Sequence, residues 1–510
     1  MRLKELLVNI EYRLICGTEE AEIRSLVYDS RKIEPGSLFI CVVGANSDGH
    51  DYLSDALRSG AAAVVIQDDH EEAVSACLSD QNLCSSESGF EAEGMTVVSV
   101  PDARYALACL SAAWFGHPAE EIPVIGITGT KGKTTSTYMI RAILEHAGYK
   151  VGLIGTIERI IGDKHIPALN TTPESYVVQQ SLREMIDAGM NLCVMEVSSQ
   201  AFKLHRCAGM TFEIGVFTNL SPDHIGPNEH ESFEEYTECK SMLFRQCRQG
   251  IVNLDDPHVH EILKGHTCLV ETYGIENDKA DLSARDLIYV HENGHIGMKF
   301  RLEGKLNMDA ELPIPGKFSV YNALTAAAVC LHFQIAEEDI RKALAEVKVR
   351  GRLETVKVSD SFSLMIDYAH NAMALDSLLT ELRDYNPGRI VCVFGCGGNR
   401  SRSRRFEMGE VSGRLADLTI ITSDNPRFED PETIMDDIVE GFSKTEGTYI
   451  RIADRKEAIR SAIVNGRPGD LIVLAGKGHE DYQEICGKKY PMDERVLIAE
   501  ILREEQEKAN

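Results

Sequence analysis

The sequence predicts an α/β protein with three domains. Short apolar runs of strand length recur along the 510 residues and alternate with stretches of helical periodicity, a pattern typical of parallel sheets covered by helices. A glycine-rich turn joins one such run, residues 122–127, to a helical stretch at 134–146. A chain of this length is too long for one hydrophobic core, so we expect about three domains.

The first domain is expected over residues 1–118. Apolar runs predict strands at 38–43 and 61–66, with a helix at 52–59 before the second strand. Residues 78–94 are polar and rich in Glu and Ser, which is typical of a surface loop.

The second domain is expected over residues 119–345, around a parallel sheet of the kind found in P-loop ATPases. Its further strands are predicted at 151–154, 192–197, 214–220 and 251–254, with helices at 173–188 and 233–248. A short antiparallel meander is predicted next, with strands at 287–290, 295–298 and 300–302 and a turn at Glu292-Asn293-Gly294. A long apolar helix at 318–333 follows.

The third domain is expected over residues 346–510 and reads as a second, Rossmann-like α/β unit. Its strands are predicted at 364–366, 390–394, 418–422 and 471–474, and an amphipathic helix at 493–505 closes the chain.

Composition excludes several classes of protein. The net charge of −27 argues against binding nucleic acid by bulk attraction. The 14 cysteines show no CxxC pair or zinc spacing and resemble reduced thiols. No stretch approaches the roughly 20 apolar residues of a membrane span, and no signal peptide is evident. We therefore expect a cytoplasmic protein, a monomer, with no nucleic-acid partner and no membrane span.

The turn after residues 122–127 has the context of a phosphate-binding loop. Backbone N–H groups and the positive end of the helix dipole would face an anion there. Lys133 could reach the outer phosphates of a nucleotide, and the Thr134 hydroxyl could ligate Mg²⁺. The alternative is an ordinary tight turn with an exposed lysine, because the glycine spacing departs from the general P-loop pattern.

Polar residues also follow other predicted strands of the second domain, where ligands gather in open α/β sheets. Glu196 and Ser198 end one strand, and Asp223 and His224 follow another. The glutamate and the histidine could ligate Mg²⁺, or the residues could form an ordinary satisfied polar cluster. On periodicity alone, Lys240 is a surface lysine of the helix at 233–248.

Three polar or glycine-rich segments follow strands of the third domain, at 395–400, 423–427 and 476–480. Together they suggest a binding cleft. Arg400 and Arg427 would suit a carboxylate or a phosphate, because guanidinium groups form paired hydrogen bonds with such anions. The alternative for Arg427 is that it caps the turn after its strand.

In this order and spacing, these segments resemble the Mur ligase family of ATP-dependent amide-forming enzymes. The family pattern Thr-Gly-Thr-x-Gly-Lys-Thr matches residues 128–134, and the resemblance covers nearly the whole chain, most closely the muramyl-tripeptide synthetase branch. The other matching motifs are Tyr28-Asp-Ser-Arg31, Asn170-Thr-Thr-Pro173, Met195-Glu-Val-Ser-Ser199, Asp223-His224, Gly351-Arg-Leu-Glu354, Asp367-Tyr-Ala-His370, Asp424-Asn-Pro-Arg427 and Gly476-Lys-Gly-His-Glu480.

The resemblance implies a reaction. ATP would phosphorylate the γ-carboxylate of D-Glu in UDP-N-acetylmuramoyl-L-alanyl-D-glutamate, and the amine of a diamino acid would attack the acyl phosphate, with Mg²⁺ as cofactor. The Asp-Asn-Pro-Arg motif implies meso-diaminopimelate as the diamino acid. The alternatives are a related ligase that adds L-lysine or another amino acid, a folylpolyglutamate-type synthetase, or a non-catalytic nucleotide-binding relative.

The resemblance also implies the site residues, with Lys133, Glu196, His224 and Lys240 as the catalytic set. ATP would lie against Gly129, Thr130, Lys131, Gly132, Lys133, Thr134, Thr135, Asn322, Arg352 and Asp367. The UDP-linked substrate would lie against Tyr28, Ser30, Ala45, Asn46, Ser47, Asn170, Thr171, Thr172, Ser198 and Arg206. The amino acid would lie against Arg400, Asp424, Asn425, Pro426, Arg427, Gly476 and Glu480. Mg²⁺ would be held by Thr134, Glu196, His224 and Lys240, the last as a carbamate.

Overall fold

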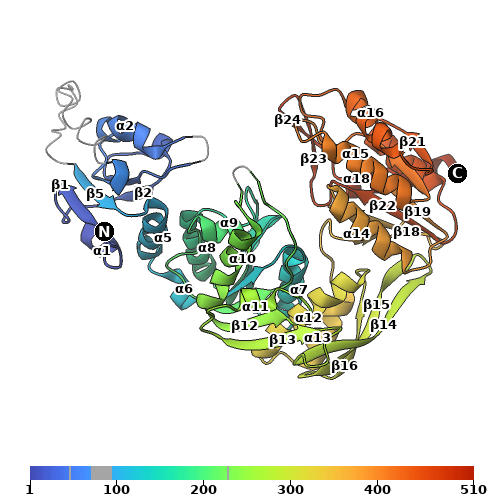
Figure 1. Cartoon of the computed structure of the whole chain (residues 1–510), viewed down its shortest axis with the longest axis horizontal. Helices are drawn as coiled ribbons and strands as arrows, with labels where there is room; N and C mark the ends of the chain where they lie inside the picture. Colours follow the sequence, from blue (N-terminus) through green and yellow to red (C-terminus); the bar gives the residue numbers. More distant parts are fainter. Residues whose placement is uncertain (45–46, 71–94, 227–228, 510) are drawn as a thin grey trace. The chain divides into compact units, whose positions relative to one another are not determined.

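The computed structural model describes residues 1–44, 47–70, 95–226 and 229–509 (Figure 1). It contains three mixed, mostly parallel α/β sheets, which confirms the predicted fold class. The chain forms two compact units, Met1–Thr137 with Gly148–Thr272 and Tyr138–Ala147 with Tyr273–Asn510. The three domain boundaries given above stay predictions, and the loop expected at 78–94 lies outside the described residues. No described helix combines the length and the apolar character needed to cross a membrane.

The first sheet belongs to the first unit and has the strand order β1-β5-β4-β3-β2. Only β1 runs antiparallel to its neighbour. Two apolar clusters cover its faces, one of them formed with α1 and α5. The strands are β1 Arg13–Cys16, β2 Ser25–Val27, β3 Ser37–Ile40, β4 Ala63–Gln67 and β5 Thr96–Val100, and the helices are α1 Leu3–Leu6, α2 Leu53–Arg58 and α5 Ala103–Trp114.

The second sheet supplies the scaffold for the glycine loop. In the first unit its order is β12-β11-β6-β10-β7-β8-β9, and β12 to β7 are parallel. The strands are β6 Val124–Thr128, β7 Val151–Ile154, β8 Glu158–Ile161, β9 Lys164–Pro167, β10 Leu192–Glu196, β11 Phe212–Phe217 and β12 Cys247–Asn253. The helices are α6 Pro118–Glu121, α7 Lys133–His146, α8 Ser175–Asp187, α9 Ser199–Lys203, α10 Phe233–Ser241 and α11 Val259–Ile262.

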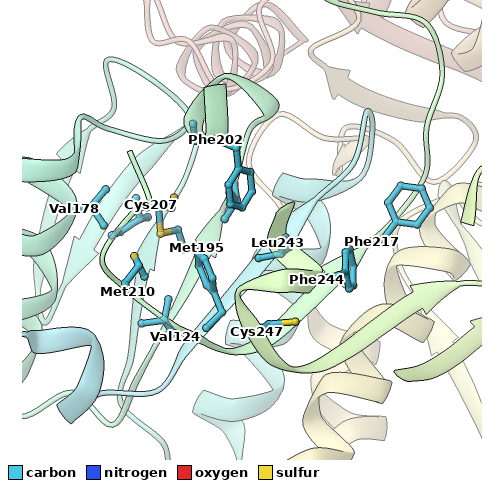
Figure 2. Packing of buried hydrophobic residues seen from close by; sticks show 14 of the residues in the cluster. Val124, Val178, Met195, Phe202, Cys207, Met210, Phe217, Leu243, Phe244 and Cys247 are labelled. Atoms are coloured by element: carbon cyan, nitrogen blue, oxygen red, sulfur yellow. The ribbon is translucent and has the colours of Figure 1, made fainter. Parts of the chain in front are cut away.

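Apolar side chains from several elements fill one face of this sheet. Figure 2 shows Met195 of β10 and Phe217 of β11 in the same cluster as Phe202 and Leu243. All four are at most 3% exposed. Because β6 and β10 are central and covered, the residues at their carboxyl ends are held on a rigid base.

The helix predicted at 233–248 is too long. α10 ends at Ser241, a 3-10 turn follows at Met242–Arg245, and β12 begins at Cys247. Cys247 pairs with Phe212 of β11, so sheet pairing overrides the helical periodicity of this segment.

The second unit contains the meander. Its elements are β13 Leu269–Gly274, β14 Leu282–Glu292, β15 His295–Gly304, β16 Met308–Leu312, α12 Lys317–His332 and α13 Glu337–Glu346. The turn at Asn293-Gly294 is confirmed, with φ of 53° and 71°. The two short strands predicted at 295–298 and 300–302 are one strand, β15, because the irregularity in this hairpin lies instead in β14, where Asp286 has φ 52°.

The third sheet also lies in the second unit, with the order β17-β18-β22-β19-β20-β21 and β17 alone antiparallel. Its predicted central strands are confirmed, whereas β17, β21 and the β23–β24 hairpin were not predicted. The strands are β17 Glu354–Val356, β18 Ser363–Asp367, β19 Arg389–Phe394, β20 Leu418–Ile421, β21 Tyr449–Arg451, β22 Asp470–Ala475, β23 Tyr482–Ile485 and β24 Lys488–Pro491. The helices are α14 Ala372–Arg383, α15 Ser403–Leu415, α16 Pro431–Phe442, α17 Arg455–Val464 and α18 Glu494–Ala509.

A buried arginine ties the carboxyl ends of two strands of this sheet. Arg455 donates to Glu494 Oε1 at 2.8 Å, and Glu494 is itself fully buried. The two terminal nitrogens of Arg455 donate to the carbonyl oxygens of Ser423 at 3.3 Å and Ala475 at 3.1 Å. Ser423 lies just after β20, and Ala475 ends β22. Arg455 therefore fixes the distance between two segments of the predicted cleft.

Replacing Arg455 by Leu should destabilise this part of the protein strongly. The substitution leaves the Glu494 carboxylate buried without its partner, which costs about 3–5 kcal/mol. Amide hydrogen exchange of β20 and β22 in the full chain measures the loss. Arg451→Leu is the control, because the ion pairs of Arg451 with Asp436 and Glu432 are partly exposed and should contribute less than about 1 kcal/mol. Equal exchange in the two variants would contradict the role given to Arg455.

Candidate active site

The turn between β6 and α7 can be built only with glycine at two positions. Gly129 has φ 147° and Gly132 has φ 86°, both in the region that residues with a Cβ atom rarely adopt. A Cβ atom on Gly129 would also clash with the hydroxyl of Thr218. The predicted strand, turn and helix are therefore confirmed: β6 and α7 are joined by a tight loop over residues 129–132.

Residues from the end of β11 hold this loop in place. The backbone N–H of Lys131 donates to Asn219 Oδ1 at 2.9 Å, and Asn219 Nδ2 donates back to the Lys131 carbonyl at 3.0 Å. The Thr218 hydroxyl donates to the same carbonyl at 2.7 Å. These contacts fix the loop from one side, so its shape does not depend on a ligand. This anchoring role of Asn219 was not predicted from the sequence.

Two lysines converge on one carbonyl oxygen of the loop. Lys133 Nζ donates to Gly129 O at 2.7 Å and to Thr130 O at 3.0 Å. Lys240 Nζ donates to the same Gly129 oxygen at 2.9 Å. Two cationic groups on one acceptor repel each other, so this arrangement favours either an anion beside them or a neutral amine on one of them.

Lys240 is the lysine whose surroundings favour the neutral form. It is 1% exposed and lies 4.4 Å from the centre of the Tyr236 ring. Burial, and after it the charge of Lys133, hold the pKa of Lys240 well below its ordinary value. The interpretation of Lys240 as a surface lysine is therefore wrong. A neutral lysine amine is also the form that can react with carbon dioxide to give a carbamate.

A buried carboxylate lies beside the first turn of α7. Glu196, which is fully buried at the end of β10, accepts a hydrogen bond of 3.0 Å from the Thr134 hydroxyl. It also accepts bonds of 2.9 Å from the backbone N–H and from the hydroxyl of Thr156. Thr156 was missed by sequence reasoning, although its place just after β7 was a signal. A carboxylate and a hydroxyl are the oxygen ligands that Mg²⁺ prefers, so Glu196 and Thr134 fit that ion.

His224 stands apart from this hydrogen-bonded group. Its side chain is 56% exposed, its backbone is left-handed with φ 54°, and its Nδ1 lies 3.1 Å from Glu229 Oε1. Its ring centre lies 6.4 Å from that of Tyr236, which borders Lys240. The part of the chain that the structure describes shows no bond from His224 to Glu196, so its role as a Mg²⁺ ligand stays a prediction.

Several residues predicted for the UDP-linked substrate meet beside β10. The Thr172 hydroxyl donates to the Glu196 carbonyl at 2.8 Å and accepts from the Ser198 N–H at 3.0 Å. Arg206 donates to the Thr172 carbonyl at 3.0 Å. The hydroxyls of Thr171 and Thr156 lie 3.0 Å apart, which connects this group to the Glu196 cluster.

The remaining predicted residues of that substrate site are more scattered. The Tyr28 ring lies 5.9 Å from that of Tyr176, and Ser30 begins a 3-10 turn at Ser30–Lys32. Asn170 is exposed, and the Ser47 carbonyl accepts from the Gly44 N–H at 2.9 Å. Ala45 and Asn46 lie outside the described residues.

A histidine pair near this region does not fit a metal ion. Asp48, His50 and His70 place three possible ligand atoms within 4.8 Å of one another. However, His50 Nε2 accepts the backbone N–H of Gln67 at 3.1 Å, so the ring proton is on Nδ1, which lies 2.6 Å from Asp48 Oδ1. Both nitrogens of His50 are thus used, and the group is a satisfied polar cluster.

Most of the residues that were predicted to bind the acceptor amino acid line one cavity of the second unit, with a volume of about 250 Å³. Arg400, Asp424, Asn425, Arg427, Gly476 and Glu480 are all in its wall, which confirms that the three strand ends form a cleft. Pro426 lies between two of these residues in the chain. The wall also contains Gly395, Cys396 and Gly397 of the predicted segment 395–400, and three residues that sequence reasoning did not assign to the site: Tyr368, His370 and Arg404.

Arg427 already has partners within the chain. Its Nε donates to Glu484 Oε2 at 3.1 Å, and its Nη1 donates to the Gly398 carbonyl at 2.7 Å. Its backbone is left-handed, with φ 52°, and exchanges hydrogen bonds with Glu484 and Cys486. Arg427 is therefore not left unpaired when no substrate carboxylate is bound, because Glu484 supplies one within the chain.

The residues predicted to contact the rest of the nucleotide lie in the second unit. Asn322 is buried in α12. The Arg352 guanidinium lies 4.7 Å from the centre of the Tyr368 ring. Asp367 accepts the backbone N–H groups of Leu353 at 2.8 Å and Ala369 at 2.9 Å, so it shapes the turn that carries Arg352.

Three family models match successive parts of the chain. The Mur ligase family, catalytic domain, matches residues 22–115; the Mur ligase middle domain matches 127–330; and the Mur ligase, glutamate ligase domain, matches 351–478.

Individual relatives match along their full length. The chain is 42% identical over 508 residues to the UDP-N-acetylmuramoyl-L-alanyl-D-glutamate--2,6-diaminopimelate ligase of Caldanaerobacter subterraneus, covering 99% of this chain and 100% of that protein. It is 40% identical over 507 residues to ligase 1 of the same name from Clostridium acetobutylicum, covering 99% and 100%. A solved structure of a ligase with this name is similar with a TM-score of 0.70 and 27% identity, covering 99% of each chain.

We predict that Lys240 carries a carbamate at neutral to alkaline pH. Because its pKa is lowered, the amine should stay neutral, and so able to react with carbon dioxide, at pH values where an exposed lysine is protonated. The carbamate should be lost as the pH falls through the pKa of Lys240. Carbon NMR with labelled bicarbonate tests this.

The carbamate signal should be absent in Lys240→Ala and present in Lys264→Ala, which removes an exposed lysine. Lys240→Ala should lose turnover and regain part of it with short carboxylic acids, which replace the missing carbamate oxygens. A signal that survives in Lys240→Ala would contradict the assignment.

Proposed function

The chain belongs to the Mur ligase family, and from this premise we propose that it is an ATP-dependent ligase that adds meso-diaminopimelate to UDP-N-acetylmuramoyl-L-alanyl-D-glutamate in peptidoglycan precursor synthesis. The observation that carries the proposal is the convergence of Lys133 and Lys240 on the glycine loop beside Glu196 and Thr134. The names of the full-length relatives support the choice of substrates.

The reaction needs an activated carboxylate. A free carboxylate is a poor electrophile. It becomes reactive when a phosphoryl group is transferred to one of its oxygens, because phosphate can then act as the leaving group. Two anions, the carboxylate and the γ-phosphate, must approach each other, so positive charge has to be concentrated between them. The N-terminus of α7 and Lys133 supply that charge at one place, whereas the N–H groups of Thr130 and Lys131, expected to face the anion, donate to Asn219 instead.

Lys133 is positioned to change partners during the reaction. Its contacts to the carbonyl oxygens of Gly129 and Thr130 keep its ammonium at the mouth of the loop. When phosphates occupy the loop, the ammonium can turn to them, because a charged acceptor binds it more strongly than a carbonyl does. The lysine would then stabilise the charge that develops as the phosphoryl group transfers.

We assign Mg²⁺ to Glu196 and Thr134, with the Lys240 carbamate and His224 as further candidate ligands. Mg²⁺ would supply Lewis-acid charge neutralisation at the transferring phosphoryl group. The contribution of the chain is to hold Glu196 in place through the three hydrogen bonds from Thr134 and Thr156.

The acceptor amino acid is assigned to the cavity lined by Arg400, Arg427, Asp424 and Glu480, which contains both cationic and acidic groups. Lys477, fully buried, donates to Asn425 Oδ1 at 2.9 Å and Glu480 Oε2 at 2.7 Å and so fixes both side chains. A diamino dicarboxylic acid offers charges of both signs that fit such a wall. The UDP-linked substrate is assigned to the residues around Thr172, Ser198 and Arg206.

Replacing Lys133 by Ala should reduce turnover by at least ~100-fold with the fold intact, since the lost charge acts mainly in the transition state. The measurement is steady-state release of phosphate with all three substrates present. Lys150→Ala, which removes an exposed lysine beyond α7, should behave as wild type. Near-normal turnover of a folded Lys133→Ala enzyme would refute the assignment of the phosphate loop.

Replacing Arg427 by Ala should lower kcat/KM for meso-diaminopimelate while leaving that for L-lysine almost unchanged, because only diaminopimelate has a carboxylate at its far end. A buried, unpaired Arg427 would give discrimination on the order of 10⁴-fold. Since Glu484 already neutralises Arg427, we expect a loss of roughly 10- to 100-fold, as for one charged hydrogen bond. Initial rates with each amino acid decide this, and equal losses for both would exclude Arg427 as the selective contact.

A further inference from the structure

The acceptor cavity contains an arginine that neither sequence motifs nor the argument so far has used. Arg404 lies in the first turn of α15, is partly buried and lines the cavity. It forms no hydrogen bond and no ion pair with any residue that the structure describes. Its neighbours in sequence differ: Arg402 pairs with Asp437, and Arg405 is buried between Asp437 and Glu429.

The arginines of the cavity have different neighbours in its wall. Arg427 and Arg400 border Gly397, because a Cβ atom there would lie 3.1 Å from Arg427 Nη1 and 3.9 Å from Arg400 Cγ. Arg404 lines the same cavity as His370 and is close enough for its charge to act on that ring. After burial, the charges of Arg404 and Arg352 are the main influences that lower the pKa of His370.

The part of the cavity wall around His370 is close to groups assigned to the nucleotide. The rings of His370 and Tyr368 lie 4.6 Å apart, and the Arg352 guanidinium lies over the Tyr368 ring at 4.7 Å. Since the attacking amine has to meet the activated carboxylate near the transferred phosphate, this part of the cavity should hold the reacting half of the amino acid. The carboxylate next to the attacking amine would then lie within reach of Arg404.

We propose that Arg404 binds the α-carboxylate of the acceptor amino acid. The second carboxylate of diaminopimelate would then be received by Arg400 and Arg427. This inference rests on the proposed function, because it presupposes an amino-acid acceptor. Arg400 and Arg427 distinguish diaminopimelate from lysine, whereas Arg404 recognises a group that every α-amino acid has. Glu484 pairs with Arg427, whereas Arg404 is a cation without a counterion from the described residues.

The test is the kinetics of Arg404→Gln with meso-diaminopimelate varied and the other two substrates saturating. Losing one charged hydrogen-bond donor should raise KM for diaminopimelate roughly tenfold or more, with KM for ATP unchanged and kcat altered much less. Arg404→Lys should restore part of the affinity, because the charge is kept and the paired geometry is lost. Arg402→Gln is the matched control on the same turn and should behave as wild type.

Three results would overturn the proposal: an unchanged KM for diaminopimelate in Arg404→Gln, a loss confined to kcat, or the same change in Arg402→Gln. A loss confined to kcat would mean that Arg404 acts on the transferred phosphate instead. Failure of the proposed function gives a different result, because the wild-type enzyme would then release no phosphate in response to diaminopimelate.

Discussion

The carbonyl oxygen of Gly129 is the point on which the catalytic half of the structure depends. Two lysines from different elements, Lys133 at the start of α7 and Lys240 in α10, donate to it at 2.7 and 2.9 Å. The loop can offer this oxygen only because Gly129 adopts a φ of 147° and leaves no side chain against Thr218. Asn219 then fixes the loop from the opposite side. The Lys133 ammonium is therefore held at the loop before any phosphate binds, with the Lys240 amine beside it.

Charge in the acceptor cavity follows a different rule, because most charged groups there are already paired within the chain. Arg427 is held by Glu484, Glu480 by Lys477 and Asn425, and the nearby Arg455 by Glu494. Such pairs orient their groups and reduce the net field, so an incoming amino acid meets fixed partners with little free charge. Selectivity at Arg427 is therefore smaller than an isolated arginine would give.

The sequence was sufficient for the fold class, the central strands and the phosphate loop, because these depend on local signals: apolar runs, helical periodicity and glycines at forced turns. Lys240 shows the limit. Helical periodicity placed it on the surface, whereas the structure buries it against Tyr236 and the loop, a contact between residues 111 positions apart. Thr156, Glu484 and Arg404 were missed for the same reason, since their roles come from tertiary neighbours. β17, β21 and the β23–β24 hairpin were missed because they are short and none of their residues is buried, so no apolar run marks them.

The central claim is that the chain activates a carboxylate by phosphorylating it at the Gly129 loop. The most direct measurement is to label both γ-carboxylate oxygens of D-Glu in the UDP-linked substrate with a heavy oxygen isotope and to analyse the phosphate released during ligation. Formation of an acyl phosphate leaves one carboxylate oxygen bound to phosphorus, so the account predicts one labelled oxygen in each phosphate. Unlabelled phosphate, with the displaced carboxylate oxygen lost to water, would contradict it.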